Sequence, residues 1–479
     1  MQPVVTPAEM AAIDADAPEP VEELIERAGW ATARAAVELL ARPYGSRVAI
    51  LAGKGNNGAD GRATVRHLER AGARCTVFDI DIDTGGGGGG SGGAAPVDGT
   101  RFDLVVDACF GTGLRGRFES SGLPVRVGDT LVLAVDIPSG VDGLTGELRG
   151  RPLPATATVT FAAPKPGLLL DPGRRLVGRL TVADIGLDCS RARMHHLQPS
   201  DLDRWPTRAP DDHKWRRAVA VVGGGPGMTG APRLAAIGAL RAGAGYVTLS
   251  TPGSADGPGA TSAAGPGGPA LPGPPIEAVG YPVTEAWADD LLGRLDRFGA
   301  AVVGPGLGEG NTGEVVRWWS GAGVPTVFDG GALTALADAG ADSGRLPRPA
   351  ILPVLTPHDG EFARLAGRAP GPDRPAAARE LAARMGAVVL LKGPTTVVAH
   401  PDQRVLLSTA GDARLATAGT GDVLSGLIGA ALAGGLEPFL AAGLAAELHG
   451  RAARRGPSVG LVASDLPTLV AALLSERAV

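Results

Sequence analysis

The 479 residues exceed what one hydrophobic core usually organises, so the sequence predicts two domains of roughly 200 to 270 residues. A net charge of −5 with 20% charged residues leaves no basic excess for a polyphosphate backbone, which argues against a nucleic-acid partner. Three widely spaced cysteines, a first segment unlike a signal peptide, and apolar runs too short to span a membrane favour a cytoplasmic protein without a membrane partner.

The first half of the chain alternates helical and strand patterns. Thr6 to Glu9 forms a capping box, which predicts that a helix starts there, and a second helix is expected over residues 21–40. A strand at 47–52, a glycine-rich turn and a helix from about residue 60 make one strand–loop–helix unit. Further strands are expected at 74–80, 104–108, 131–136 and 157–161. The pattern predicts a parallel α/β sheet.

The second half has the same pattern. A polar, proline-bearing stretch at residues 198–212 indicates the domain boundary, and a strand at 218–222 then enters a glycine-rich turn. Strands are expected at 300–303, 325–329, 350–355, 387–392 and 396–399, so this domain is also α/β. Two stretches rich in glycine and proline, residues 84–93 and 251–275, are predicted to be flexible loops.

The segment GKGNNGADG, residues 53–61, has the GxGxxG spacing between a strand and a helix, and Asp79 follows Gly58 by about twenty residues. This pattern suggests a dinucleotide site, although a dehydrogenase loop or a plain packing turn can have the same spacing. The adjacent amides of Asn56 and Asn57 favour a site that also takes a weakly hydrated cation, since amide oxygens are hard ligands.

Two later strands also end in polar residues. Asp107 precedes a Gly-Thr-Gly turn, and Asp136 is followed by Ser139. Because the carboxyl ends of strands in an open α/β sheet share one crevice, Asn57, Asp107 and Ser139 are predicted to converge on one cation while Asp136 faces the ligand. The alternative is that each aspartate caps a helix.

Over about residues 1–203 these motifs resemble the epimerase domain of bifunctional NAD(P)H-hydrate repair enzymes. The match also includes ERAG (26–29), VDACFGTGL (106–114), VDIPSGVDGLTG (135–146) and FAAPKPG (161–167). The resemblance implies a Rossmann-like three-layer α/β/α fold, with K⁺ at Asn57, Asp107 and Ser139. It implies substrate contacts at Asn56, Asn57, Gly58, Ala59, Asp60, Gly111, Thr112, Gly113, Leu114, Arg115, Gly116, Arg117 and Asp136. Ala59 replaces the family's usual glycine, so mild backbone strain is expected there.

In the second half, AGTGDVLSG (418–426) opens a helix with small residues and places Asp422 in its first turn. Exposed N–H groups at a helix start bind phosphate, and an aspartate beside them can take a hydroxyl proton during phosphoryl transfer. The alternative is a capping aspartate. LKGPTT (391–396) adds Lys392, and TPHDGEF (356–362) places His358 between a strand and a helix.

These motifs resemble the family's ribokinase-like dehydratase domain over about residues 205–479. The resemblance implies Mg²⁺ and ADP as the phosphoryl donor. It implies substrate contacts at Ala231, Gly306, Gly308, His358 and Asp422. It implies nucleotide contacts at Lys392, Gly393, Pro394, Thr395, Thr396 and Gly421. The family's Asp-Ala-Asp is here Asp329-Gly330-Gly331, so one polar contact is missing.

The resemblance implies that the N-terminal domain interconverts the R and S forms of hydrated NAD(P)H, and Asp136 is our candidate for the acid–base group. The C-terminal domain would dehydrate the S form at the expense of ADP, giving AMP and phosphate, with Asp422 as base. Family members often assemble, which points to a homo-oligomer. The alternatives are a ribokinase-type kinase of a small metabolite, a nucleotide-sensing binding protein and a plain dehydrogenase.

Overall fold

The computed structural model describes residues 1–80, 97–114, 116–119, 123–254, 274–341, 344 and 346–477. The glycine run, most of the second glycine- and proline-rich stretch, and Arg115 lie outside the described residues. The chain forms two compact units, Gln2–Met194 and His195–Val479 with Met1. Residues 195–203, which the sequence analysis assigned to the N-terminal domain, therefore belong to the second unit.

The N-terminal unit is built around a six-stranded parallel sheet of order β11-β10-β8-β5-β2-β3. Its sheet strands are β2 (Arg47–Ala52), β3 (Arg74–Asp79), β5 (Leu104–Ala108), β8 (Leu131–Val135), β10 (Ala157–Phe161) and β11 (Arg179–Ala183). Its α-helices are α1 (Pro7–Ala15), α2 (Val21–Leu40), α3 (Asn56–Arg70) and α4 (Pro166–Leu169). The short strands are β1 (Gln2–Val4), β4 (Val97–Asp98), β6 (Phe118–Glu119), β7 (Val125–Arg126) and β9 (Gly150–Arg151).

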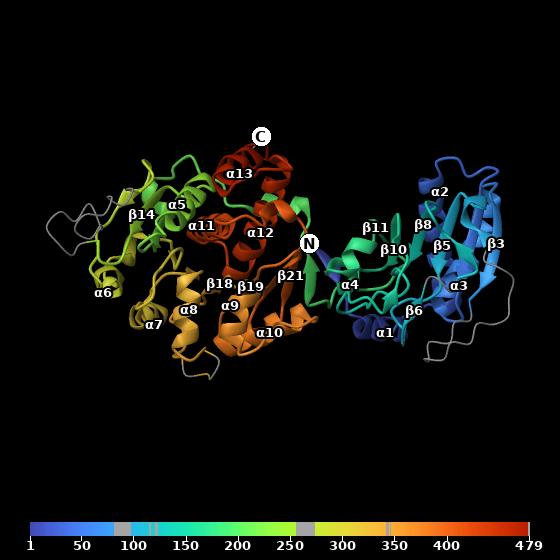
Figure 1. The fold of residues 1–479 in the computed structure, drawn as a ribbon, viewed down its shortest axis with the longest axis horizontal. Helices are drawn as coiled ribbons and strands as arrows, with labels where there is room; N and C mark the ends of the chain where they lie inside the picture. Colours follow the sequence, from blue (N-terminus) through green and yellow to red (C-terminus); the bar gives the residue numbers. More distant parts are fainter. Residues whose placement is uncertain are drawn as a thin grey trace. The chain divides into compact units, whose positions relative to one another are not determined.

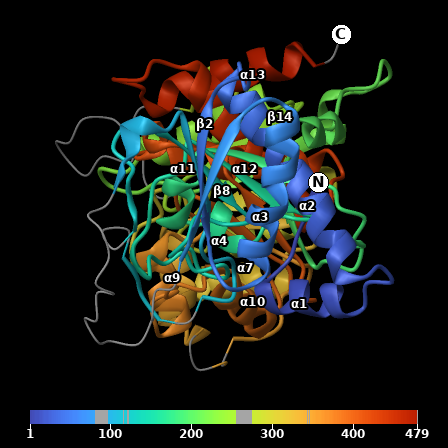
Figure 2. The ribbon, with the colours of Figure 1, turned by 90° about the vertical axis from the view of Figure 1, so that its right-hand side faces the viewer.

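Both faces of this sheet are covered. Alternate residues of β2, such as Ile50 and Leu51, point to opposite faces and are fully buried. Helices α2 and α3 pack on the face of Ile50, and Figure 2 shows them side by side across the strands. Phe118 and Leu123 pack on the face of Leu51. The predicted parallel α/β fold is confirmed.

The C-terminal unit has a larger sheet. From β12 onward its order is β12-β21-β20-β19-β18-β17-β16-β13-β14-β15, parallel from β19 to β15 and antiparallel across β19, β20 and β21. The strands are β12 (Met194–His196), β13 (Ala218–Val222), β14 (Tyr246–Ser250), β15 (Val279–Gly280), β16 (Ala300–Val303), β17 (Thr326–Phe328), β18 (Val354–Leu355), β19 (Val388–Leu391), β20 (Thr396–Ala399) and β21 (Val405–Ser408).

Helices cover both faces of the larger sheet. They are α5 (Gly230–Arg241), α6 (Trp287–Leu292), α7 (Thr312–Gly321), α8 (Gly331–Asp338), α9 (Asp359–Ala366), α10 (Arg374–Met385), α11 (Thr420–Ala433), α12 (Pro438–Arg455) and α13 (Leu466–Ser475). Figure 1 shows α5, α11, α12 and α13 on one face and α7 to α10 on the other. The α/β prediction is confirmed here too. Within the described ranges, every helix is too short or too polar to cross a membrane.

Candidate active sites

The glycine-rich loop of the N-terminal unit lies against the carboxyl ends of β2 and β5. A Cβ atom on Gly53 would lie 1.9 Å from the carbonyl oxygen of Cys109, and one on Gly58 would lie 1.9 Å from the carbonyl oxygen of Gly53. Neither position has room for a side chain. Helix α3 begins at Asn56, a turn earlier than the sequence predicted, so both asparagines lie in its first turn.

Ala59 lies inside α3, and its φ is not among the positive values of the chain. The expected backbone strain at this residue is therefore wrong. Alanine is the best helix former, so replacing the family's usual glycine with it does not disturb the helix.

A pocket of about 440 Å³ opens beside this loop. Of the predicted substrate contacts, its lining includes Asn56, Asn57, Asp60, Gly111, Thr112, Gly113, Leu114 and Asp136. Gly58, Ala59, Gly116 and Arg117 are not part of the lining, and Asp79 is an exposed partner of Arg62.

The three predicted cation ligands, Asn57, Asp107 and Ser139, lie at or beside residues 107–111, which contain the end of β5 and the turn after it. Asp107 is fully buried and accepts hydrogen bonds from the Ser139 hydroxyl at 2.6 Å and the Ser139 backbone N–H at 2.9 Å. The Ser139 hydroxyl also lies 2.9 Å from the backbone nitrogen of Phe110, and the next residue, Gly111, packs against Asn57. Burial raises the pKa of Asp107, and the hydrogen bonds from Ser139 and Cys109 oppose this shift. A cation nearby would stabilise the carboxylate.

The side chain of Asn57 fits a position that binds an ion. Both polar atoms of its side-chain amide are buried, and neither has a hydrogen-bond partner among the described residues. Buried amides are normally satisfied, so an unpartnered one indicates an absent ion, water or ligand. Across the described ranges no three His, Cys, Asp or Glu side chains gather as a metal site. A cation here would therefore rely on oxygen donors, the amide of Asn57, the hydroxyl of Ser139 and the carboxylate of Asp107, which fits K⁺ better than a transition metal.

The pocket also holds a buried ion pair. Lys165 is 2% exposed, and its Nζ donates to Asp136 Oδ1 at 2.6 Å and to Thr160 Oγ1 at 3.1 Å. Asp136 has a φ of 64°, a left-handed conformation that is uncommon for residues other than glycine but that aspartate adopts more often than most. Burial, together with the charges of Asp136 and Asp14, raises the pKa of Asp60 to about 8 although Lys165 opposes the shift. The pocket thus contains a carboxyl, that of Asp60, which keeps its proton near neutral pH.

The C-terminal site is built on the start of α11. Gly419 precedes the helix with a φ of 90°, and a Cβ atom on Gly421 would lie 3.3 Å from Lys392 Nζ. The lysine ammonium therefore lies against the first helical turn, where N–H groups bind phosphate. Burial and the charges of Asp329 and Glu361 raise the pKa of Asp422 to about 7, with Lys392 opposing.

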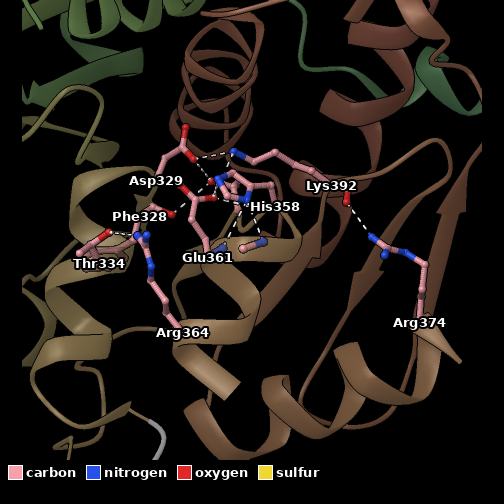
Figure 3. A network of polar contacts seen from close by, with 10 residues as sticks. Phe328, Asp329, Thr334, His358, Glu361, Arg364, Arg374 and Lys392 are labelled. Atoms are coloured by element: carbon pink, nitrogen blue, oxygen red, sulfur yellow. Dashed lines mark hydrogen bonds and ion pairs between the residues drawn. The ribbon is translucent and has the colours of Figure 1, made fainter. Parts of the chain in front are cut away.

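Figure 3 shows His358 and Lys392 in one polar network, in which both approach the carboxylate of Glu361. His358 Nδ1 accepts hydrogen bonds from the backbone nitrogens of Gly360 at 3.0 Å and Glu361 at 3.3 Å, so the ring caps α9. A ring nitrogen that accepts carries no proton, and the neutral ring therefore holds its proton on Nε2. The His358 side chain is 61% exposed, and its Nε2 lies 3.5 Å from Glu361 Oε2.

The structure also brings Ala231 and the Gly306 turn together. A Cβ atom on Gly306 would lie 3.1 Å from the Ala231 side chain, and the φ of Gly306 is 65°. Gly308 faces open space. In the nucleotide segment, Thr395 is buried, Thr396 begins β20, and the carbonyl of Lys392 is held by Arg374 at 2.7 Å.

Comparisons with known proteins find family matches for both halves of the chain. The family described as NAD(P)H-hydrate dehydratase matches residues 219–474, and the family described as YjeF-related protein N-terminus matches residues 21–84 and 90–167. A bifunctional NAD(P)H-hydrate repair enzyme from Moorella thermoacetica is 38% identical over 97% of this chain and 95% of its own length. The chain belongs to the family of bifunctional NAD(P)H-hydrate repair enzymes.

Other NAD(P)H-hydrate repair enzymes match similarly. The one from Salinibacter ruber is 35% identical over 99% of this chain and 96% of its own length. Among solved structures, the ADP/ATP-dependent NAD(P)H-hydrate dehydratase of Bacillus subtilis, co-crystallised with ATP and Mg²⁺, is 27% identical with a TM-score of 0.49. It covers 59% of this chain and 98% of its own chain.

The structure gives site contacts to Lys165, Glu361 and Arg374, which the sequence does not single out, and it gives Asp329 a partner, Lys392. Lys165 lies in the FAAPKPG segment, residues 161–167, which resembles the family but gives this lysine no role. For Asp329 the sequence shows only that the family's second aspartate is replaced by Gly331. Lys165 and Asp329 each follow a buried parallel strand, and this position was the signal that could have identified them.

Proposed function

We propose that this chain repairs NADH and NADPH that have gained water across a ring double bond. The N-terminal unit interconverts the two epimers of the hydrate, and the C-terminal unit removes the water from the S form. The observation that carries the proposal is the arrangement of Asp422, with a pKa raised to about 7, in the helical turn that also faces the Lys392 ammonium. A base of this pKa beside a phosphate site suits phosphoryl transfer to a hydroxyl near neutral pH.

In the C-terminal unit, Asp422 takes the proton of the ring hydroxyl as the oxygen attacks the terminal phosphorus of ADP and AMP leaves. Phosphate then departs with the electrons of the carbon–oxygen bond and takes a proton from the neighbouring carbon, whose carbon–hydrogen electrons form the ring double bond. His358 donates its Nε2 proton in a hydrogen bond, and Lys392 and the N–H groups around Gly421 receive phosphate oxygens. Mg²⁺ bound with the nucleotide would offset the charge of the diphosphate.

The predicted contacts divide between substrate and nucleotide. The hydrate is proposed to contact Ala231, Gly306, Gly308, His358 and Asp422. The nucleotide is proposed to contact Lys392, Gly393, Pro394, Thr395, Thr396 and Gly421. The contact of Ala231 with Gly306 and that of Lys392 with Gly421 support these two groups.

In the N-terminal unit, Asp136 is the proposed acid–base group, and Asp60 lies in the same pocket with a pKa of about 8. The hydroxyl carbon of the hydrate is bonded to the ring nitrogen, so its configuration can invert if the carbon–nitrogen bond opens and closes again. Asp136 can take the hydroxyl proton while Asp60 protonates the nitrogen. Rotation and the reverse transfers give the other epimer and restore both carboxyls.

K⁺ is proposed to bind at Asn57, Asp107 and Ser139, supported by the unpartnered amide of Asn57 and the buried carboxylate of Asp107. The free thiols Cys75, Cys109 and Cys189 support a reducing, cytoplasmic setting. Association into a homo-oligomer is proposed only because family members often assemble.

The deciding experiment follows the absorbance of reduced nicotinamide during incubation of mixed-epimer NADPH hydrate with K⁺ and Mg²⁺, comparing ADP, ATP and no nucleotide. Full, nucleotide-dependent recovery is expected with ADP. If only the fraction of the hydrate present as one epimer is recovered as NADPH, the epimerase activity proposed for the N-terminal unit is contradicted. A stable phosphorylated product without recovery would instead indicate a kinase of a small metabolite.

A further inference from the structure

The side chain of Asp329 belongs to the polar network in Figure 3, where its carboxylate faces the Lys392 ammonium. This residue follows β17 and is 3% exposed. Its Oδ1 accepts hydrogen bonds from Lys392 Nζ at 2.9 Å and from Thr356 Oγ1 at 2.8 Å. A buried carboxylate is costly unless it is paired and hydrogen-bonded, and Asp329 is both.

The chain has no room for the family's second aspartate in this loop. A Cβ atom on Gly331 would lie 2.0 Å from the carbonyl oxygen of Leu307. Position 331 therefore needs glycine in this backbone, and Asp329 supplies the carboxylate that this short loop directs at Lys392.

The partner of Asp329 lies at the phosphate site. Lys392 Nζ is 3.9 Å from Glu361 Oε2 and lies against Gly421 at the start of α11. Burial lowers the pKa of Lys392, but the carboxylates of Asp329 and Glu361 outweigh burial and leave the pKa raised. The ammonium is thus charged and held in one place, although a lysine side chain is otherwise highly flexible.

Asp329 also acts on the proposed base. The groups that act on Asp422 are Asp329 after β17, Glu361 on α9 and Lys392 after β19. The buried His449 of α12 is uncharged near neutral pH, since burial lowers its pKa to about 4. The negative charge of Asp329 therefore makes the Asp422 carboxyl harder to ionise, while Lys392 acts in the opposite direction.

We propose that Asp329 is a positioning residue of the dehydratase site. Its carboxylate holds the Lys392 ammonium against Gly421 for the nucleotide phosphates, and its negative charge makes Asp422 harder to ionise. The inference rests on the proposed dehydratase function. It assigns Asp329 a role through Lys392 and Thr356, which both donate to its Oδ1, and not through the substrate.

The test compares Asp329→Asn in the full chain with the wild type and with Asp338→Asn, which removes an exposed carboxylate at the end of α8. Initial rates of ADP-dependent dehydration of the S hydrate are measured from pH 5 to 9, with kcat and KM for ADP at each pH. Asparagine keeps the shape and one acceptor oxygen but removes the charge, so it separates the charge of Asp329 from its packing.

For Asp329→Asn we expect kcat/KM for ADP to fall by about tenfold to a hundredfold, since Lys392 is less firmly placed. The acid limb of the kcat profile should move to lower pH, because Asp422 ionises more easily without the neighbouring charge. Asp338→Asn should match the wild type in both respects. An Asp329→Asn enzyme with an unchanged KM and an unchanged acid limb would overturn the proposal.

A second variant tests the proposal if Asp329→Asn does not fold. Thr356→Val removes the hydroxyl that orients Asp329 but keeps its charge, so KM for ADP should rise while the acid limb stays in place. A shift of the acid limb in Thr356→Val as large as that in Asp329→Asn would overturn the proposed role of the charge. A wild-type chain without any dehydration would instead overturn the function on which the inference rests.

Discussion

Lys165 and Asp136 form a buried ion pair in the N-terminal pocket, with Nζ 2.6 Å from Oδ1. The lysine side chain is 2% exposed and the aspartate side chain 15% exposed, so the pair is largely removed from water. Removing one partner of such a pair leaves an uncompensated buried charge, which costs more than the net contribution of the intact pair.

Lys165→Met should therefore lower the free energy of unfolding by about 3 to 5 kcal/mol and abolish epimerisation. Urea unfolding and the interconversion rate of the hydrate epimers measure the two effects. Arg42→Met, which removes an exposed cation, is the control and should change stability by less than about 0.5 kcal/mol. A Lys165→Met protein as stable as this control would show that the pair does not matter to the fold.

Asn57→Leu tests the potassium site through stability rather than activity. The amide of Asn57 is buried without a partner, so replacing it with an apolar side chain should cost little in Na⁺ buffer. The wild type should gain thermal stability when K⁺ replaces Na⁺, because a bound ion stabilises the folded state. The variant should show no such gain, and an equal response of the two proteins to K⁺ would exclude this site.

Asp60→Asn should alter the pH dependence of stability. The pKa of Asp60 is raised from 3.8 to about 8 by burial and by Asp136 and Asp14. The folded protein therefore keeps a proton that the unfolded chain loses, and this stabilisation is complete below about pH 4 and lost as pH rises to about 8. The stability of the wild type relative to the variant should fall across this window, by at most about 1.4 kcal/mol per pH unit.

Urea unfolding at each pH measures the Asp60 effect, and Asp16→Asn, an exposed aspartate at the end of α1, is the matched control. A constant difference between wild type and Asp60→Asn from pH 4 to 8 would mean that Asp60 ionises normally in the folded protein.

The strands could be predicted closely because they are continuous buried apolar runs. The strands at residues 47–52, 104–108, 157–161, 218–222 and 300–303 begin and end as predicted. The strand expected at 350–355 is limited to β18, since Pro353 has no N–H to donate to a sheet. Helix α3 starts at Asn56, earlier than predicted, and so includes Gly58. This glycine is needed for close packing against Gly53, which a local sequence pattern does not reveal.

The site was only partly predictable. Asn57 and Asp136 could be named because they follow strands that end at one edge of a parallel sheet. The partners of such residues are harder to find, since Lys165 is 29 residues from Asp136 and Lys392 is 63 residues from Asp329. These pairs depend on how neighbouring strands place their loops, and only the folded chain shows it.

Asp422→Asn should abolish nucleotide-dependent dehydration while leaving folding and epimerisation intact, because the amide cannot take the hydroxyl proton. The absorbance assay on the S hydrate measures the first activity, and epimer interconversion on the same preparation is its control. Dehydration at the wild-type rate would refute the assignment of Asp422 as base.

His358 has two roles that can be tested separately, as the N-cap of α9 and as a hydrogen-bond donor. Its Nδ1 caps α9 through the backbone nitrogens of Gly360 and Glu361, while its Nε2 carries the proton that the substrate or phosphate would receive as a hydrogen bond. Asparagine is a good N-cap but has no group that reaches as far as Nε2, whereas alanine offers neither function. His358→Asn should therefore keep wild-type stability, and His358→Ala should lose about 1 kcal/mol.

Both His358 variants should lose dehydratase activity to a similar extent, since both lack the Nε2 donor. Thermal unfolding and initial rates with ADP measure the two properties on the same samples. If His358→Asn dehydrates the S hydrate at the wild-type rate, the ring serves only as a cap. If activity falls only in His358→Ala, the loss comes from a disordered start of α9 and not from a missing hydrogen bond to the substrate.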